Sequence, residues 1–188
     1  MDLTATHTVV LVEGDSDRVA IETLAFRLGR RLEGVAVVAV GGASKFGRHL
    51  KTYGPQGHDI ALAGMYDLGE EDDVVRALDR AGMGSPQSRA NIEALGFFVC
   101  VVDLEDELIR SLGPDRVLQV IESADERGVF RSFQNQPAWR GRTIEDQLHR
   151  FMGTFSGRKV RYGNLLVEAL DLDRVPEPLE KLLDHVTG

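Results

Sequence analysis

The sequence predicts an α/β protein with a parallel four-stranded sheet flanked by helices and a helical C-terminal part. Three observations support this fold class. Four short apolar runs alternate with helical patterns, as in βαβ units. These runs are continuously apolar, which is typical of parallel strands buried on both faces. Each run ends in acidic or glycine-rich sequence, and ligands bind at the C-terminal edge of such sheets.

The individual elements follow from these patterns. The predicted strands are residues 7–12, 35–40, 60–66 and 97–102. The predicted helices are residues 16–31, 45–53, 72–81, 104–112, 114–124, 143–151, 164–170 and 178–186. Residues 128–141 contain Pro137 and are predicted to form an irregular loop. We expect an α/β core over residues 1–125, with residues 126–188 adding a basic loop and helices that complete the same domain.

Length and composition favour one domain in a reducing compartment. The chain has 188 residues, of which 43% are hydrophobic. The single cysteine, Cys100, lies inside an apolar run, so we expect a buried thiol and no disulfide. No signal pattern and no apolar run of membrane-spanning length is present. These features predict a cytoplasmic protein that does not associate with membranes.

Charge is distributed unevenly along the chain. The formal net charge is −8, yet residues 127–161 contain eight basic and two acidic residues, a local charge of +6. A basic segment beside an acidic site suits a polyanion such as nucleic acid. A solvated basic surface without a ligand is the alternative.

Carboxylates follow three of the four predicted strands. A single acidic residue here, such as Asp15 or Asp106, is more simply read as a charge that stabilises a helix N-terminus. Several together repel one another unless a cation or protons compensate, and oxygen ligands favour Mg²⁺, Mn²⁺ or Ca²⁺ over zinc. The five histidines show no recognisable partner spacing. The acidic residues at the three tips are Glu13 and Asp17, then Asp67, Glu70 and Glu71, then Asp103 and Glu105.

The ordered set of these motifs resembles the Toprim domain, a metal-binding module of topoisomerases, primases and nucleases. The resemblance is carried by residues 11–17 (LVEGDSD), a strand ending in Asp67, the segment Asp103-Leu104-Glu105, and residues 157–163 (GRKVRYG). The closer match is the Toprim module of the overcoming-lysogenization-defect (OLD) nucleases. It spans about residues 7–170 and implies a Rossmann-like Toprim fold.

The resemblance also implies roles for individual residues. Glu13 and Lys159 would be catalytic, with Lys159 stabilising charge on the scissile phosphate. The usual Toprim Asp-x-Asp motif is broken here, because Gly69 stands where the second aspartate belongs, so Glu70 or Glu71 would substitute. The metal ligands for one or two Mg²⁺ or Mn²⁺ ions would be Glu13, Asp17, Asp67, Asp103 and Glu105.

The sequence therefore predicts a metal-dependent endonuclease that hydrolyses DNA by a two-metal mechanism. OLD proteins usually couple Toprim to an ATPase domain, but no G-x-x-x-x-G-K-[ST] loop occurs here. We thus expect a standalone Toprim protein, with a separate ATPase protein as a candidate partner. The alternatives are a non-catalytic or regulatory nucleic-acid-binding module, or another Toprim phosphotransfer enzyme. The expected DNA-binding residues are Arg140, Arg142, Arg150, Arg158 and Arg161.

Overall fold

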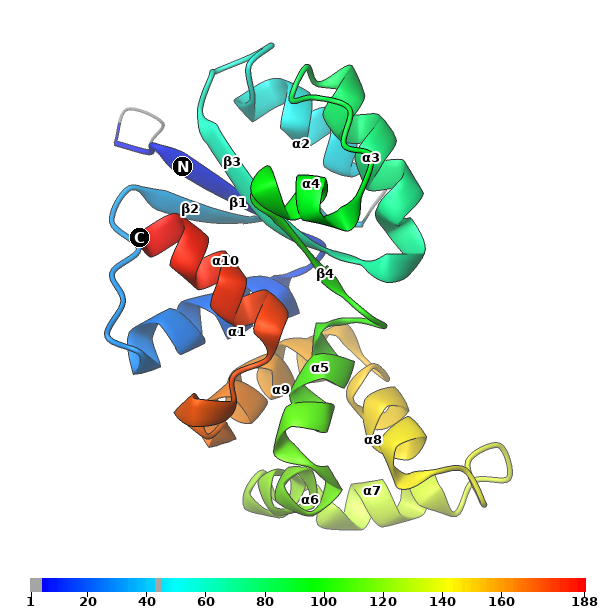
Figure 1. Cartoon of the computed structure of the whole chain (residues 1–188). Coiled ribbons are helices and arrows are strands. Elements are labelled where there is room, and N and C mark those ends of the chain that lie inside the picture. Colours follow the sequence, from blue (N-terminus) through cyan, green and yellow to red (C-terminus); the bar gives the residue numbers. More distant parts are fainter. Residues whose placement is uncertain (1–4, 43–44) are drawn as a thin grey trace.

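A parallel sheet forms the centre of the protein (Figure 1). The computed structural model describes residues 5–42 and 45–188. All three strand pairs are parallel and the strand order is β2-β1-β3-β4, which confirms the predicted fold class. The strands are β1 (Thr8–Val12), β2 (Val35–Ala39), β3 (Ala61–Asp67) and β4 (Phe97–Cys100).

Helices cover both faces of the sheet, as the continuous apolar strands require. Val9 and Leu11 of β1 point into one core, and Val10 and Val12 point into the other. The first face carries α2 (Phe46–Tyr53), α3 (Glu71–Arg80) and α4 (Arg89–Ala94), and the second carries α1 (Asp15–Arg27) and α10 (Glu177–Thr187) (Figure 1).

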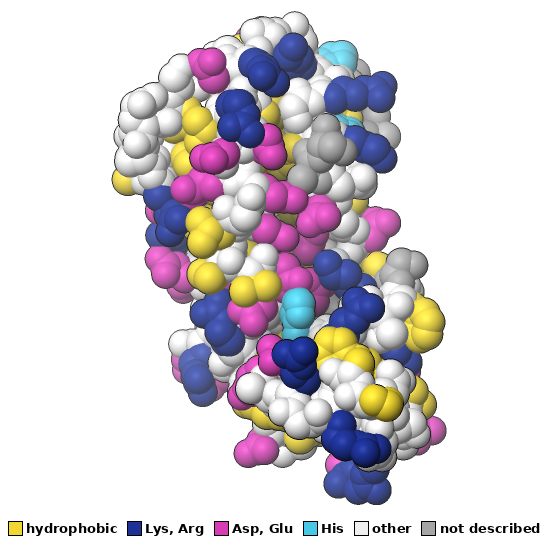
Figure 2. Space-filling model, turned by 90° about the vertical axis from the view of Figure 1, so that its right-hand side faces the viewer, with side chains coloured by type: hydrophobic (Ala, Val, Ile, Leu, Met, Phe, Trp, Pro, Cys, Tyr) yellow, Lys and Arg dark blue, Asp and Glu magenta, His cyan; other side chains and the backbone are white. Residues whose placement is uncertain are grey.

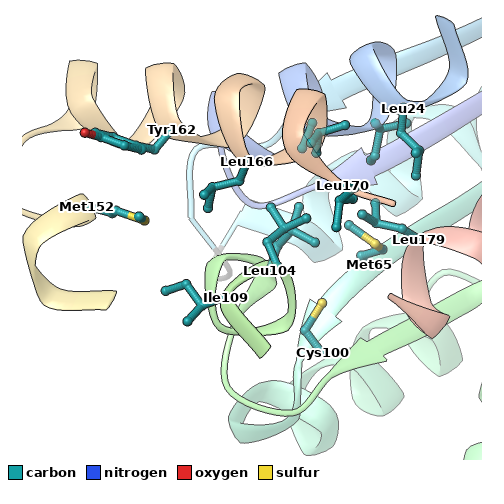
Figure 3. Close-up of a cluster of buried hydrophobic side chains, with 14 of the residues drawn as sticks. Leu24, Met65, Cys100, Leu104, Ile109, Met152, Tyr162, Leu166, Leu170 and Leu179 are labelled. Carbon is teal, nitrogen blue, oxygen red and sulfur yellow. The ribbon is translucent and has the colours of Figure 1, made fainter. Parts of the chain in front are cut away.

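The remaining helices form a lobe below the sheet (Figure 1). Their bounds are α5 (Leu104–Leu112), α6 (Pro114–Ser123), α7 (Arg127–Gln134), α8 (Ile144–Met152) and α9 (Ser156–Ala169). Figure 3 shows Met65 and Cys100 from the sheet in one apolar cluster with Ile109 and Met152 from the lobe. The lobe and the sheet therefore share a continuous core, in which Cys100 is a buried free thiol as expected.

Helix α9 packs closely along α1. A Cβ atom added at Gly163 would stand 2.8 Å from the backbone oxygen of Ser16, so only glycine allows this approach. Because Lys159 lies one turn earlier on α9, the contact brings its side chain to the start of α1.

Two expectations about the C-terminal half are wrong. Residues 127–134 form α7 instead of a loop, because Phe130 and Phe133 are buried against the ring of Phe151. Helix α9 begins at residue 156 instead of 164, so the glycine-bounded segment 157–163 is helical and not a loop. The structure also adds α4 and two short 3₁₀ turns, η2 (Leu68–Glu70) and η3 (Leu172–Arg174). No helix in residues 5–42 and 45–188 is long and apolar enough to cross a membrane.

Candidate metal centre

The first carboxylates stand where β1 passes into α1. The Glu13 side chain is exposed at the tip of β1, and its carbonyl oxygen accepts hydrogen bonds from the amides of Gly41 and Gly42 at 2.9 and 3.3 Å. Asp17 lies in the first turn of α1 and is 8% exposed. The amide of Gly14 donates to Asp17 Oδ2 at 2.8 Å. This cap orders the turn that positions both carboxylates at the sheet edge.

After the tip of β3, the two candidate substitute ligands, Glu70 and Glu71, lie in different surroundings. Asp67 ends the strand, and η2 follows it. Glu71 turns away, because its Oε2 accepts from the Tyr66 hydroxyl at 3.1 Å and lies 3.2 Å from Nε of Arg89. Glu70 has no hydrogen bond or ion pair among the described residues, and its pKa is raised by burial and by the charge of Glu13. The geometry thus favours Glu70 over Glu71 beside the centre.

The tip of β4 contributes Asp103 and Glu105 through the start of α5. Asp103 caps the helix, accepting from the amide of Asp106 at 2.9 Å. Glu105 is 2% exposed, and its Oε2 lies 3.1 Å from Nζ of Lys159. This contact is an ion pair without hydrogen-bond alignment, because the same buried oxygen has no hydrogen-bond partner among the described residues. The Glu105 carboxylate therefore keeps a free acceptor site.

Electrostatics show that groups from the three tips influence one another. Burial raises the pKa of Asp17 to about 7, and the nearby charge of Glu105 adds to this. Burial and then the charges of Glu13 and Asp103 raise the pKa of Asp67 to about 7. For Lys159, burial alone would lower the pKa, but Glu105 and Asp17 raise it overall, so the ammonium stays charged. The structure thus brings all the predicted ligands and Lys159 to one edge of the sheet.

His149 of α8 also reaches this edge, which the sequence did not predict. Its Nε2 lies 2.7 Å from Asp103 Oδ2, and this hydrogen bond raises the pKa of His149. Burial acts to raise the pKa of Asp103, but the contacts with His149 and the Asp106 amide bring it below its usual value. The sequence spacing of the histidines gave no sign of a partner, but His149 has one in the fold. Its partner is 46 residues away in the sequence, so no local spacing could reveal it.

Comparison with known proteins agrees with this geometry. Residues 6–68 match the family model of the overcoming lysogenization defect protein-like TOPRIM domain. These residues resemble an OLD-like TOPRIM domain. The structure of the chain resembles the C-terminal region of the Burkholderia pseudomallei OLD protein, with a TM-score of 0.71, 23% identity, and 97% of each chain covered. No curated protein sequence matches the chain.

A second solved structure extends the likeness. The C-terminal region of the Xanthomonas campestris pv. campestris OLD protein matches with a TM-score of 0.75 and 25% identity, covering 97% of this chain and 92% of that one. Both structures are C-terminal regions of OLD proteins, and the match includes the helical lobe as well as the sheet. The predicted resemblance and the Toprim fold are confirmed.

The donor set of this TOPRIM domain fits a hard divalent cation. All its candidate ligands are carboxylates, two of them have pKa values raised to about 7, and Glu105 keeps a buried oxygen without a hydrogen bond. In residues 5–42 and 45–188, no three His, Cys, Asp or Glu side chains stand close enough to hold a metal ion without rearrangement. Binding would therefore require rotation of side chains at the three strand tips.

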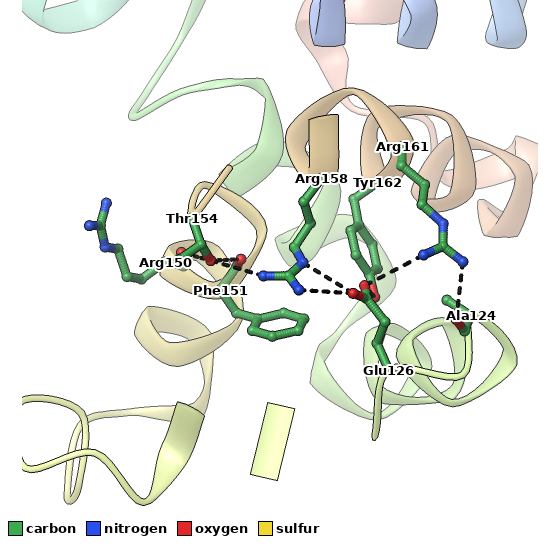
Figure 4. A network of polar contacts seen from close by, with 8 residues as sticks. All are labelled: Ala124, Glu126, Arg150, Phe151, Thr154, Arg158, Arg161 and Tyr162. Atoms are coloured by element: carbon green, nitrogen blue, oxygen red, sulfur yellow. Dashed lines mark hydrogen bonds and ion pairs between the residues drawn. The ribbon is translucent and has the colours of Figure 1, made fainter. Parts of the chain in front are cut away.

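The expected DNA-binding arginines divide into two groups. Arg158 lies over the Phe151 ring at 4.3 Å and donates to Glu126 from Nη2 at 2.9 Å. Arg161 faces the same carboxylate, which also accepts from Tyr162 at 2.8 Å (Figure 4). These two arginines therefore stabilise the lobe of the TOPRIM domain. Arg161 is itself about half exposed, and Arg140, Arg142 and Arg150 are exposed without an ion pair among the described residues.

The raised pKa of Asp67 gives a stability prediction. A carboxyl whose pKa is higher in the folded than in the unfolded state makes unfolding easier as pH rises from about 4 to about 7. Asp67→Asn should therefore stabilise the metal-free protein at pH 8 by about 1–2 kcal/mol, after allowance for solvent screening, and change little near pH 4. Urea unfolding with EDTA at both pH values measures this difference.

The matched control is Asp72→Asn, which removes an exposed carboxylate in the first turn of α3. It should change stability by no more than about 0.5 kcal/mol at either pH. If Asp67→Asn is less stable than the wild type at pH 8, the Asp67 carboxylate is not under electrostatic strain in the folded protein.

Proposed function

We propose that this TOPRIM domain is a metal-dependent nuclease that hydrolyses phosphodiester bonds of DNA. The observation that carries the proposal is the ion pair between buried Glu105 and partly exposed Lys159, beside Asp17. It sets a permanently charged ammonium among carboxylates from three strand tips. Phosphodiester hydrolysis needs both groups, since carboxylates hold cations and an ammonium offsets charge that builds on the phosphate.

The proposed work of each residue follows from its position. Glu13, Asp17 and Asp67, with Glu70 near Glu13, would hold Mg²⁺ or Mn²⁺ on the β1–β3 side, and Asp103 and Glu105 would hold a second ion on the β4 side. When bound, such a cation polarises the phosphate and acidifies a water molecule.

Protein groups supply the rest of the proposed mechanism. Lys159 keeps its proton throughout, so it contributes a fixed positive charge instead of acting as an acid or base. Releasing Glu105 to a cation would free this ammonium to approach the scissile phosphate. His149 would act on Asp103 alone, holding the Oδ2 atom by its hydrogen bond and so fixing the orientation of that carboxylate.

A non-catalytic nucleic-acid-binding or regulatory module is the second candidate. Gly69 supports it, because the residue supplies no carboxylate where the Toprim motif has its second aspartate. Glu70 restores a carboxylate only one position later, inside a 3₁₀ turn. If Glu70 fails to reach a metal, the domain would hold one ion or none.

Cleavage of supercoiled plasmid by the purified chain separates the two candidates. The nuclease proposal expects nicking with Mn²⁺, weaker nicking with Mg²⁺, and none in EDTA. ATP should leave the rate unchanged, because the sequence lacks a phosphate-binding loop and a separate ATPase protein would have to bind the nucleotide. DNA binding without metal-dependent cleavage under all these conditions would support the regulatory module instead.

A further inference from the structure

A groove runs between α2 and α3, away from the expected DNA-binding arginines. One hollow of about 470 Å³ is lined by Arg48, Lys51 and Arg80. An adjoining hollow of about 310 Å³ shares Arg80 with it and extends to Glu70. Both include Gly47 and Ala77, where the helices come close together. The groove therefore leads from the carboxylate centre onto the outer surface of α2 and α3.

Three of the basic side chains in this groove lack acidic partners, whereas Arg76 in the second hollow is paired with Asp73. Arg48, Lys51 and Arg80 are exposed, and none forms an ion pair in the described parts of the chain. Lys45, Arg48 and Lys51 follow one another at three-residue spacing, so their like charges repel one another along α2. Arg89 forms an ion pair with Glu71 at the start of α3, so its charge is neutralised.

The uncompensated charge also acts on His49 of α2. Burial lowers the pKa of His49, and the charges of Arg48 and Lys45 lower it further. Figure 2 shows acidic side chains across the middle of one face, with basic side chains above them, where α2 and α3 lie, and below them on the lobe. The carboxylate centre thus lies between two basic surfaces.

We propose that the α2–α3 groove binds the sugar-phosphate backbone of DNA next to the bond that is cleaved. Arg48, Lys51 and Arg80 would contact successive phosphates of the strand that leaves the centre on this side. Phe46, the groove's aromatic residue, is 5% exposed and offers no surface for base stacking, so contact is with phosphates and independent of sequence. This inference rests on the proposed function, since it takes the substrate to be DNA.

The test compares two triple variants with the same change in net charge. The groove variant is Arg48→Gln, Lys51→Gln and Arg80→Gln. The control carries Arg31→Gln, Arg116→Gln and Arg174→Gln, three exposed arginines outside both hollows. Fluorescence anisotropy with a labelled DNA duplex, with Ca²⁺ present to avoid cleavage, gives the affinity. Thermal melting confirms that both variants fold.

The groove variant should lose affinity by on the order of 100-fold at about 0.1 M salt. The slope of log affinity against log salt concentration should become shallower, by the equivalent of up to about three released counterions. The control should stay within about threefold of the wild type. Equal losses in both variants, or wild-type affinity in the groove variant, would overturn the proposal. So would loss of inorganic phosphate or mononucleotide binding with unchanged DNA affinity, because the groove would then be a small-anion site.

The experiments distinguish failure of the groove proposal from failure of the nuclease proposal. If the wild type cleaves no DNA but binds it through the groove, the groove proposal stands and the nuclease proposal fails. If the wild type cleaves DNA and the groove variant binds DNA normally, the nuclease proposal stands and the groove proposal fails.

Discussion

Glu13→Ala should reduce Mn²⁺-dependent DNA cleavage by about 100- to 1000-fold, the scale expected when a group that stabilises transition-state charge is lost. Glu13 stands exposed at the tip of β1, and its charge raises the pKa of both Asp67 and Glu70. No described residue hydrogen-bonds its side chain, so the substitution removes a charge without disturbing packing. Plasmid cleavage and calorimetric titration with Mn²⁺ measure the two losses expected, in rate and in metal affinity.

Asp15→Ala is the matched control, two residues along the same turn. Its carboxylate is exposed and pairs with Arg18 at 3.1 Å, which is a surface ion pair worth at most about 1 kcal/mol. Cleavage by this variant should stay close to that of the wild type. Equal activity in wild type and Glu13→Ala would show that the cleavage comes from elsewhere, and unchanged Mn²⁺ affinity would remove Glu13 from the ligand set.

Lys159→Ala should lower the single-turnover rate at saturating DNA by about 100-fold or more while DNA affinity falls little. The reason is that its ammonium is held at the centre by Glu105, away from the exposed basic surfaces. Arg140→Ala, on the exposed surface of the lobe, should instead weaken DNA affinity and leave the rate at saturation normal. If Lys159→Ala keeps full turnover at saturation, Lys159 is only surface charge.

The same variant should also be less stable without metal. Removing Lys159 leaves Glu105 buried and unpaired, which costs about 1–3 kcal/mol given that the lysine side chain is itself 36% exposed. Adding Glu105→Gln should recover part of this stability but none of the activity. A double variant that is less stable than Lys159→Ala alone would show that the ion pair does not carry the stability difference.

The strands and their carboxylates were predictable because both depend on local sequence. Continuous apolar runs define buried parallel strands, and the carboxyl ends of those strands meet at one edge wherever the helices lie. The four-residue spacing of Glu13 and Asp17 likewise follows from one turn of helix. These features need no knowledge of long-range contacts.

The helical lobe was harder to predict because tertiary contacts decide its local structure. The glycines in the segments that form α7 and the start of α9 favour loops when only local sequence is considered. Burial of Phe130, Phe133 and Tyr162 in the core makes these segments helical. The basic count over residues 127–161 does not show which of its charges are paired. Glu126 lies just before that segment and forms ion pairs with Arg158 and Arg161. The unpaired cations of the α2–α3 groove lie in another part of the sequence.

Helix α9 joins the two halves of the protein through neighbouring residues. Arg158 points into the lobe toward Glu126, Lys159 points to the carboxylate centre, and Gly163 fixes the helix against α1. The backbone of a helix moves as one rigid element, so a displacement at Arg158 is passed on to Lys159. A shift of the lobe relative to the sheet would carry Lys159 and Glu105 together and move both relative to Asp67 at the tip of β3, which ties the alignment of the centre to the packing of the lobe.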